Sequence, residues 1–376
     1  MFETNILYEK SKYTNLLPRS YPQKDTPLLL YGPPKSGKTS LALQYAKIAK
    51  NPVFIDCADM RFGVQEAKTD LLKLFLEKGF DLLVVDNYDK NLTLPNFSNI
   101  ILITNMPSVS DFYAKNTDDL NMPSALPKKI IRKEMILPLS FREFVSFSKT
   151  QRLEGIFSTF LKSGNLPEMP FLLESKHSAR NQEIIRLAYP RHTEIFLELA
   201  RFQGRVFSTL GLLAKLKPYF KTSKDTVYAF VENLKAQGSI FLLPHSDFSS
   251  GTKSKLYLYN FALPYSLIKT PNFQHIFENM IFCELLIKYG VFGYAFDSKD
   301  KHSKNAIRYN DECDFLINDI AYLAMPFPNE TLIKARLDKL KNAYKKVIVI
   351  SIEHSHKHKD YEIQSFIDFA LDDEGL

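Results

Sequence analysis

The residues with the clearest chemical pattern follow position 31. Gly32, Gly37, Lys38 and Thr39 fit the spacing G-x-x-x-x-G-K-[ST], which is typical of a loop that binds the phosphates of a nucleotide. Glycines let the backbone curl so that successive N–H groups point at an anion. The lysine then reaches the β- and γ-phosphates, and the threonine hydroxyl holds Mg²⁺. The spacing therefore predicts a binding site for ATP and Mg²⁺.

The flanks of this loop agree with the prediction. Apolar residues 28–31 precede it as a buried strand would, and Leu41, Leu43, Ala46 and Ile48 follow it at positions that suit a helix. The positive end of that helix would face the same anion. The alternative is a Gly/Pro turn before a surface helix. The nucleotide is expected to contact Gly32, Pro33, Pro34, Lys35, Ser36, Gly37, Lys38, Thr39 and Ser40.

A carboxylate for the metal is expected at Asp86. Four apolar residues lead to it, as in a Walker B strand whose acid reaches Mg²⁺. Hydrolysing proteins with both motifs mostly have a glutamate next, which activates the attacking water, whereas this chain has Asn87. Asparagine orients water but accepts no proton. Turnover is therefore open, and Asp56 and Asp89 are either substitute bases or plain acids at strand ends.

Further polar residues follow the next strand. The segment 99–105 ends in Thr104 and Asn105, and we predict that Asn105 contacts the γ-phosphate or the water, unless it only forms a turn. Arg132 and Arg142 are candidates for contact with the γ-phosphate, with ordinary surface arginines as the alternative. The predicted catalytic set is Lys38, Asp86, Asn87 and Asn105.

The elements that must position these residues alternate between strand and helix. Segments with short apolar runs at 28–31, 52–57, 81–89 and 99–105 and a helical pattern at 66–79 predict an α/β fold with a parallel sheet. Residues 106–130 are polar and broken by prolines, and predict a loop. The segment 133–147 predicts a last strand that turns into a helix, and helices are expected from about 150 to 200.

A winged helix-turn-helix is predicted for residues 192–265. Amphipathic segments at 192–202, 206–216 and 223–238 predict three helices, and two alternating runs with a polar tip between them follow. Basic residues in a span without acids suit contacts to the phosphates of double-stranded DNA. They are Arg201, Arg205, Lys215, Lys217, Lys221 and Lys224. Docking of a protein partner is the alternative, because the third helix carries Tyr228 and Phe230 and few groups that read bases.

With these motifs in this order, the chain resembles the bacterial and archaeal AAA-type P-loop ATPases that carry a C-terminal winged helix and a restriction-endonuclease-like domain. ILPLSFREF (136–144) resembles the end of the ATPase core, and SGNLPE (163–168) its lid. The resemblance implies an AAA-type domain at 1–150, a helical lid at 151–191, the winged helix at 192–265 and a nuclease-like α/β domain at 270–376. It also implies an ATPase whose nucleotide state controls how the other parts engage DNA or a partner. A non-hydrolysing ATP-binding switch or scaffold is the alternative.

The nuclease-like part departs from the pattern of that fold. The resemblance implies metal-binding acids at Glu278 and Asp314, followed by Glu-x-Lys on the next strand. That strand has Leu323 and Met325 instead. We therefore expect a catalytically degenerate domain, and a metal-dependent DNA nuclease is the disfavoured third function.

Composition agrees with a cytoplasmic protein. The chain has 376 residues, a formal net charge of +7 and 45% hydrophobic residues, enough for several packed domains. The basic balance weakly favours an acidic partner. Cys57, Cys283 and Cys313 match no metal spacing and no disulfide framework. No run is long enough to cross a bilayer, and we expect an exposed loop, not a metal site, at His354, His356 and His358. An oligomer is possible.

Overall fold

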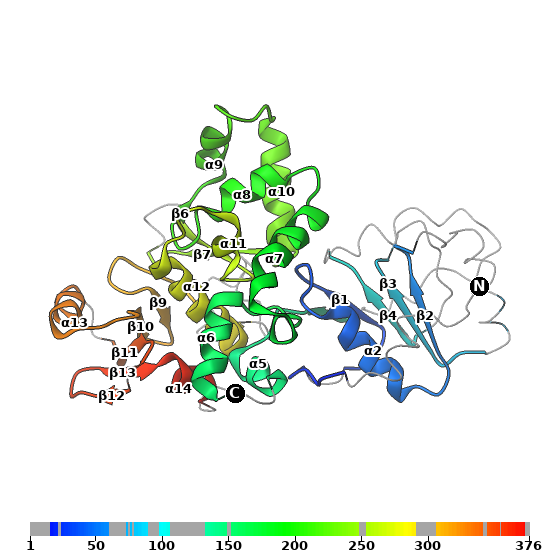
Figure 1. Ribbon diagram of the computed structural model, residues 1–376, viewed down its shortest axis with the longest axis horizontal. Coiled ribbons are helices and arrows are strands. Elements are labelled where there is room, and N and C mark those ends of the chain that lie inside the picture. The colour runs from blue at the N-terminus through cyan, green and yellow to red at the C-terminus, as the bar shows by residue number, and fades with distance from the viewer. Residues whose placement is uncertain are drawn as a thin grey trace. The chain divides into compact units, whose positions relative to one another are not determined.

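The computed structural model forms two compact units, residues 1–137 and 138–376, which are described separately (Figure 1). The residues that the structure describes are 16–21, 24–59, 73, 76, 79–88, 98–105, 132–148, 152–247, 253–290, 306–340, 344–353 and 355–372. The predicted loop at 106–130, most of the predicted helix at 66–79, Asp89 and His354 lie outside them.

The first unit is built on a five-stranded parallel sheet in the order β2-β3-β4-β1-β5. Its described elements are β1 (Leu28–Tyr31), α2 (Lys38–Ile48), β2 (Pro52–Asp56), β3 (Leu82–Asp86), β4 (Ile100–Ile103) and β5 (Arg132–Met135). The predicted α/β class and the parallel sheet are confirmed. β4 lies between β1 and β3, so the carboxyl ends of these three strands are neighbours at one edge of the sheet.

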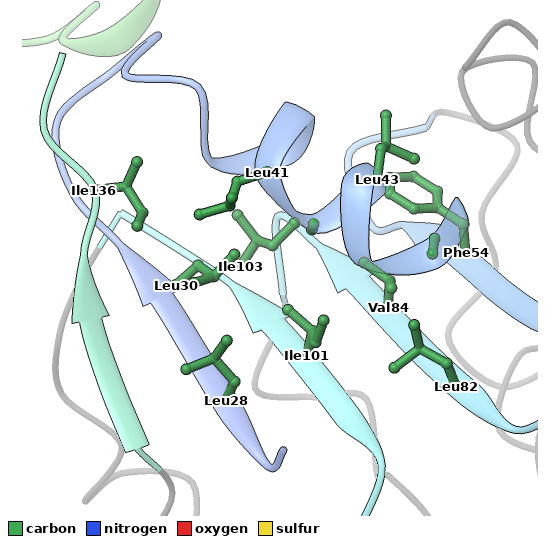
Figure 2. Packing of buried hydrophobic residues seen from close by; sticks show 12 residues of the cluster. Leu28, Leu30, Leu41, Leu43, Phe54, Leu82, Val84, Ile101, Ile103 and Ile136 are labelled. Atoms are coloured by element: carbon green, nitrogen blue, oxygen red, sulfur yellow. The ribbon is translucent and has the colours of Figure 1, made fainter. Parts of the chain in front are cut away.

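The central strands β1, β3 and β4 of this unit are unbroken apolar runs in the sequence because they lie in its buried core. Leu30, Val84 and Ile103 on the sheet and Leu41 and Leu43 on α2 are at most 6% exposed. Figure 2 shows the strand side chains pointing toward α2, which packs across β4, β3 and β2. The loop between β1 and α2 is therefore held by a strand and a helix that are both fixed in the core.

The second unit begins with helices. They are α5 (Phe141–Phe147), α6 (Leu153–Ser163), the 3₁₀ turn η1 (Met169–Phe171), α7 (Glu174–Ala188) and α8 (Thr193–Ala200). A capping box starts α5, since the Ser140 hydroxyl accepts from the Glu143 N–H and the Glu143 carboxylate accepts from the Ser140 N–H, both at 3.1 Å. The unit boundary places α5 in the second unit. The predicted four-part division remains a prediction.

Residues 192–265 contain the predicted helices and hairpin. After α8 come β6 (Val206–Phe207), α9 (Thr209–Leu216), α10 (Lys224–Ala236), β7 (Ile240–Pro244) and β8 (Ser254–Leu258), with an antiparallel sheet in the order β6-β8-β7. The prediction of helix at Val206 and Phe207 is wrong. The helix begins only after Ser208, whose hydroxyl accepts from the Gly211 N–H at 3.0 Å, and this leaves the two preceding residues to pair with β8.

The last part of the chain is a second α/β arrangement. It comprises α11 (Leu263–Leu267), α12 (Phe273–Leu285), the π-helical turn η3 (Leu286–Gly290), β9 (Phe315–Ile317), β10 (Ile320–Ala324), α13 (Glu330–Leu337), β11 (Lys346–Ser351), β12 (His356–Lys357), β13 (Glu362–Ser365) and α14 (Phe366–Leu371). The sheet order is β12-β13-β11-β10-β9, with β10, β11 and β13 parallel. His356 is exposed as predicted, but it belongs to strand β12 and not to a loop.

Phenylalanine fills the interior of this unit in the absence of tryptophan. The Phe141 ring centroid lies 5.1 Å from that of Phe160 and 5.7 Å from that of Phe366. The Phe141 N–H also donates to the Glu284 carboxylate at 2.7 Å, and burial raises the pKa of Glu284 to about 8. These contacts fix the start of α5 against α12 and α14. Among the helices that the structure describes, none is long and apolar enough to span a membrane.

Candidate nucleotide-binding site

The loop between β1 and α2 requires glycine at two places. Gly32 has φ 145° and Gly37 has φ 97°, a region that L side chains rarely adopt. A Cβ on Gly32 would lie 2.4 Å from the Ile136 carbonyl oxygen. Lys35 is also left-handed, with φ 59°. The motif is thus a folded loop whose backbone turns sharply.

Lys38, the first residue of α2, turns back into this loop. Its ammonium donates to the carbonyl oxygens of Gly32 at 3.0 Å and Pro33 at 2.8 Å. Burial lowers the pKa of Lys38 to about 8, opposed by the charge of Asp86 and assisted by that of Lys35. The ammonium is buried and, among the described residues, donates only to backbone carbonyl oxygens, so its charge is not neutralised by them. Such a cation strongly attracts an anion.

Two features of the loop were not evident from the sequence. The Arg19 guanidinium is buried and donates to the carbonyl oxygens of Ser36 and Leu137, both at 2.8 Å, so it ties the loop to the segment after β5. The Ser36 side chain is 0% exposed, and its hydroxyl has no hydrogen-bond partner in the described part of the chain. No local signal reveals Arg19, because its partners lie 17 and 118 residues away.

We expect Ser36→Ala to separate stability from binding. Removing a buried, unpaired hydroxyl leaves the free protein at least as stable as the parent, because an unsatisfied polar group costs about 1–3 kcal/mol. If the hydroxyl meets a phosphate oxygen, the rise in melting temperature with Mg²⁺–ATP becomes smaller in the variant. Thermal melts with and without nucleotide measure both effects. A less stable free variant with an unchanged nucleotide response would contradict the expectation.

The two residues predicted to hold the metal, Thr39 and Asp86, meet at the carboxyl end of β3. The Thr39 hydroxyl donates to Asp86 Oδ2 at 2.6 Å, and the Asn87 N–H donates to Asp86 Oδ1 at 2.8 Å. Burial raises the pKa of Asp86, opposed by these two hydrogen bonds, while the nearby charge of Asp56 raises it further. A buried carboxylate beside a hydroxyl offers the oxygen ligands that Mg²⁺ prefers.

Asn87 is engaged with the neighbouring strand. Its amide nitrogen donates to Asp56 Oδ1 at 2.9 Å, and its backbone is left-handed with φ 49°. Asp56 pairs in register with Asp86 and also accepts from the Ala58 N–H at 2.9 Å. β2 lies one strand further from the loop than β3. Asp56 is therefore anchored beside Asp86 and not above the loop from Gly32 to Thr39.

Three further residues were predicted to contact the nucleotide, namely Asn105, Arg132 and Arg142. Asn105 is exposed just past the end of β4, between β1 and β3, and its contact with nucleotide stays a prediction. Arg132 pairs in register with Leu28 at the start of β1, at the edge of the sheet opposite the loop. Arg142, in α5, donates to the Leu371 carbonyl. Arg132 is therefore not brought to the loop. Arg142 belongs to the second unit, and its contact with nucleotide stays a prediction.

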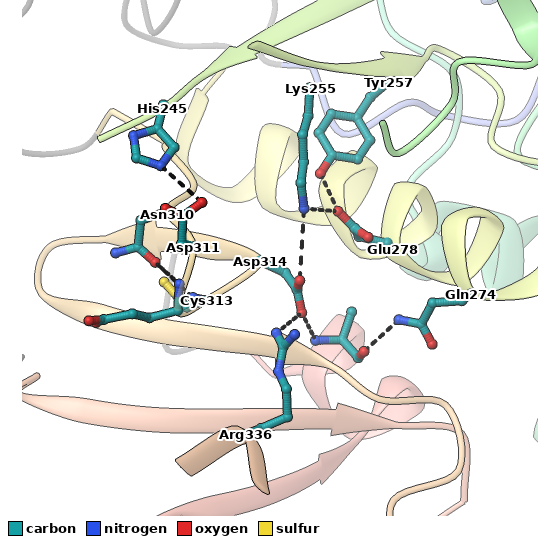
Figure 3. Close-up of polar contacts among 12 residues, drawn as sticks. His245, Lys255, Tyr257, Gln274, Glu278, Asn310, Asp311, Cys313, Asp314 and Arg336 are labelled. Atoms are coloured by element: carbon teal, nitrogen blue, oxygen red, sulfur yellow. Dashed lines mark hydrogen bonds and ion pairs between the residues drawn. The ribbon is translucent and has the colours of Figure 1, made fainter. Parts of the chain in front are cut away.

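The predicted nuclease-like acids form a second buried cluster. Lys255 Nζ lies 2.8 Å from Glu278 Oε1 and 3.8 Å from Asp314 Oδ1. The Tyr257 hydroxyl donates to Glu278 at 2.6 Å, and Arg336 donates to Asp314 at 2.9 Å. Figure 3 shows Lys255 between the two carboxylates and Arg336 on the far side of Asp314.

Side-chain cations neutralise these acids. Leu323 and Met325, which stand where the fold would carry an acid and a lysine, are buried in a hydrophobic cluster. Burial and the charge of Asp314 raise the pKa of Glu278 to about 7, against the opposing effect of Lys255. No group of three or more metal-capable His, Cys, Asp or Glu side chains occurs among the described residues. The arrangement favours a structural cluster over a metal centre.

Together, the parallel sheet and the loop from Gly32 to Thr39 define a P-loop-like α/β protein. No family model and no curated protein matches the chain. A solved Walker-type ATPase of Pyrococcus abyssi is similar to it, with a TM-score of 0.42 and 15% identity over 71% of this chain and 96% of that one. The Orc1 protein of Aeropyrum pernix, solved in complex with DNA, has a TM-score of 0.28 and 13% identity over 66% of this chain and 88% of that one.

Proposed function

We propose that this protein binds ATP with Mg²⁺ on the loop from Gly32 to Thr39. The observation that carries the proposal is the inward-turned ammonium of Lys38 beside the Thr39–Asp86 pair, with a hydrogen bond of 2.6 Å in that pair. The orphaned Ser36 hydroxyl supports the fit of a phosphate in the same loop. These groups converge from β1, α2 and β3, which a generic Gly/Pro turn does not require.

Each of these residues has a defined task toward the nucleotide. The backbone N–H groups of the loop and of the first turn of α2 bind phosphate oxygens, and Lys38 neutralises their charge. Thr39 and Asp86 hold Mg²⁺, which when bound offsets the charge on the phosphates. Arg19 keeps the loop in its curled form through the Ser36 carbonyl.

The test is the nucleotide-dependent melting temperature of the parent and of Lys38→Ala. Ligand at 100 times its dissociation constant adds about 2.7 kcal/mol of stability, and the variant should lose most of this gain. Because the pKa of Lys38 in the free protein is about 8, binding to the parent should weaken from pH 8 to pH 9 as the ammonium deprotonates, while the variant shows no such trend. An equal rise in melting temperature with nucleotide in both proteins would contradict the proposal.

We further propose that hydrolysis is slow. Asn87 supplies no proton acceptor, and its amide is committed to Asp56. The second candidate, a switch or scaffold that binds ATP and never hydrolyses it, rests on the same observation. Single-turnover hydrolysis with labelled ATP separates the two, since phosphate release above the buffer rate that is lost in Lys38→Ala identifies an ATPase.

The helices and hairpin of residues 192–265 are proposed to act as a winged helix whose engagement of double-stranded DNA or of a protein partner depends on the nucleotide state. The exposed basic side chains of α9 and α10 and of the segment between them support phosphate contacts. Binding through such contacts weakens with salt, with a log–log slope of about −0.9 per phosphate. A flat salt response would favour a protein partner.

A further inference from the structure

A cleft in the second unit lies away from the helix α10 that the winged-helix proposal assigns to DNA. Its volume is about 380 Å³, and its described lining comes from the end of α8, from β6, α9 and α11, and from the first turn of α12. α10 contributes none of these lining residues. Figure 1 shows the contributing elements within the second unit. The volume falls in the range of roughly 300–1,000 Å³ that is usual for ligand sites.

Positive charge dominates the lining of this cleft. Arg201, Arg205 and Lys215 face a single acid, Glu198, which pairs with Arg201 at 3.1 Å. Arg205 and Lys215 are exposed and make no ion pair with any described residue. His275 adds no charge near neutral pH, because burial and then the charges of Arg205 and Lys255 lower its pKa. Two cations are therefore available for an anion.

The backbone that carries Arg205 is rigidly held. The buried amide of Gln203 donates to the Phe261 carbonyl at 2.9 Å and to Asn279 Oδ1 at 2.8 Å. Gly204 has φ 70° and packs so closely that a Cβ would lie 2.9 Å from the Cβ of His275. Because this backbone is already ordered, binding in the cleft costs less conformational entropy.

Apolar side chains complete the walls of the cleft. Phe202, Val206 and Ile268 belong to the lining, and Val206 is 54% exposed. Such a wall beside two cations suits a ligand that joins a charged group to a less polar body. The planar guanidinium of arginine donates two parallel hydrogen bonds to one phosphate, and water competes poorly with this paired contact.

We infer that this cleft binds a nucleotide phosphate, with Arg205 and Lys215 on the phosphate and the apolar wall against the sugar or base. The nucleotide is either free or part of a nucleic-acid strand. The site is separate from the ATP loop and does not depend on it. The inference divides the basic residues predicted for DNA into two sets, Arg201, Arg205 and Lys215 in the cleft, and Lys217, Lys221 and Lys224 outside it.

The test compares two double variants of the full-length protein that each remove two exposed positive charges. Arg205→Gln with Lys215→Gln alters the cleft. The matched control is Lys176→Gln in α7 with Lys334→Gln in α13, two exposed positions outside the cleft and outside the residues proposed to contact DNA. The probes are thymidine monophosphate, followed by calorimetry, and a fluorescein-labelled 12-nucleotide single strand, followed by anisotropy. All titrations are repeated in a Lys38→Ala background, so that a failure of the ATP proposal leaves this measurement intact.

The cleft variant should bind at least one probe at least about tenfold more weakly than the parent, because both charge-assisted contacts to the phosphate are lost. The control should change less than threefold. For the strand, two lost contacts should also reduce the salt slope by about 1.4. Binding of thymidine monophosphate assigns a free nucleotide, and binding of the strand alone assigns nucleic acid.

Two outcomes would overturn the inference. One is that neither probe binds the parent protein, and the other is that both double variants lose affinity equally, which indicates general electrostatic attraction. A charge-preserving exchange, Arg205→Lys with Lys215→Arg, guards against misfolding. It should retain most of the binding, and loss of binding in this variant at an unchanged melting temperature would also contradict phosphate contact through two cations.

Discussion

Replacing Lys255 by methionine is expected to destabilise the second unit by about 3–5 kcal/mol at pH 8, the usual cost of removing one partner from a buried ion pair. Lys255 is 17% exposed and lies between Glu278 and Asp314, which are 6% and 12% exposed. Methionine fills much of the same volume but leaves Glu278 with only the Tyr257 hydroxyl among its described partners. Arg336 still pairs with Asp314. The loss should therefore centre on Glu278.

The size of this effect should depend on pH. Burial and the charge of Asp314 raise the pKa of Glu278 from 4.5 to about 7 in the folded parent. The folded state then binds more protons than the unfolded state between these values, so stability falls as pH rises through this window. Without Lys255 the pKa of Glu278 rises further and the penalty above pH 7 grows. Near pH 5 the carboxyl is protonated in both proteins, and the difference between them should shrink.

Urea unfolding at pH 5, 7 and 8, followed by circular dichroism, measures this prediction. Lys253→Met is the matched control, because Lys253 is exposed two residues earlier and forms no ion pair with any described residue. Its midpoint should stay close to that of the parent at every pH. Equal destabilisation by the two substitutions, or a loss that grows toward pH 5, would show that the acids are not held by Lys255.

Local sequence patterns sufficed for the strands and the helix that the structure describes in the first unit. The apolar run before Gly32 and the helical spacing after Lys38 reflect burial within one short segment, and the structure has β1 and α2 there. The hydrogen bond between Thr39 and Asp86 follows from two motifs whose carboxyl-edge positions in a parallel sheet are fixed by topology. Strand order was not predicted, because pairing of β4 with both β1 and β3 depends on contacts distant in sequence.

The residues that sequence reasoning missed act across long separations. Arg19 reaches Leu137, and Arg336 reaches Asp314 from α13. From the sequence alone, an arginine or lysine is predicted to be a surface residue. Only the folded structure shows which carbonyl or carboxylate it contacts. β12 and β13 were missed because they are short and mostly polar, and β12 is an edge strand of the sheet.

The geometry of Asn87 sharpens the question of turnover. Its φ of 49° is a conformation that asparagine tolerates better than glutamate. Its amide donates to Asp56, whereas a carboxylate at this position would face Asp56 and Asp86 as a third negative charge. Both features favour asparagine for the stability of the free protein. Asparagine at position 87 is therefore consistent with two explanations, the stability of the local structure and a function with slow hydrolysis. Only a substitution at this position separates these explanations.

Asn87→Glu is expected to accelerate single-turnover ATP hydrolysis by about 10²–10⁴-fold, the usual contribution of a positioned general base. The same change should destabilise the free protein by about 1–2 kcal/mol, because a left-handed backbone disfavours glutamate. Asn87→Gln is the matched control, since it has the same length and the same backbone strain but accepts no proton. Labelled ATP with protein in excess measures the rate. Equal rates in the Glu and Gln variants would mean that a missing base does not limit turnover, and a fast parent would mean that Asn87 already suffices.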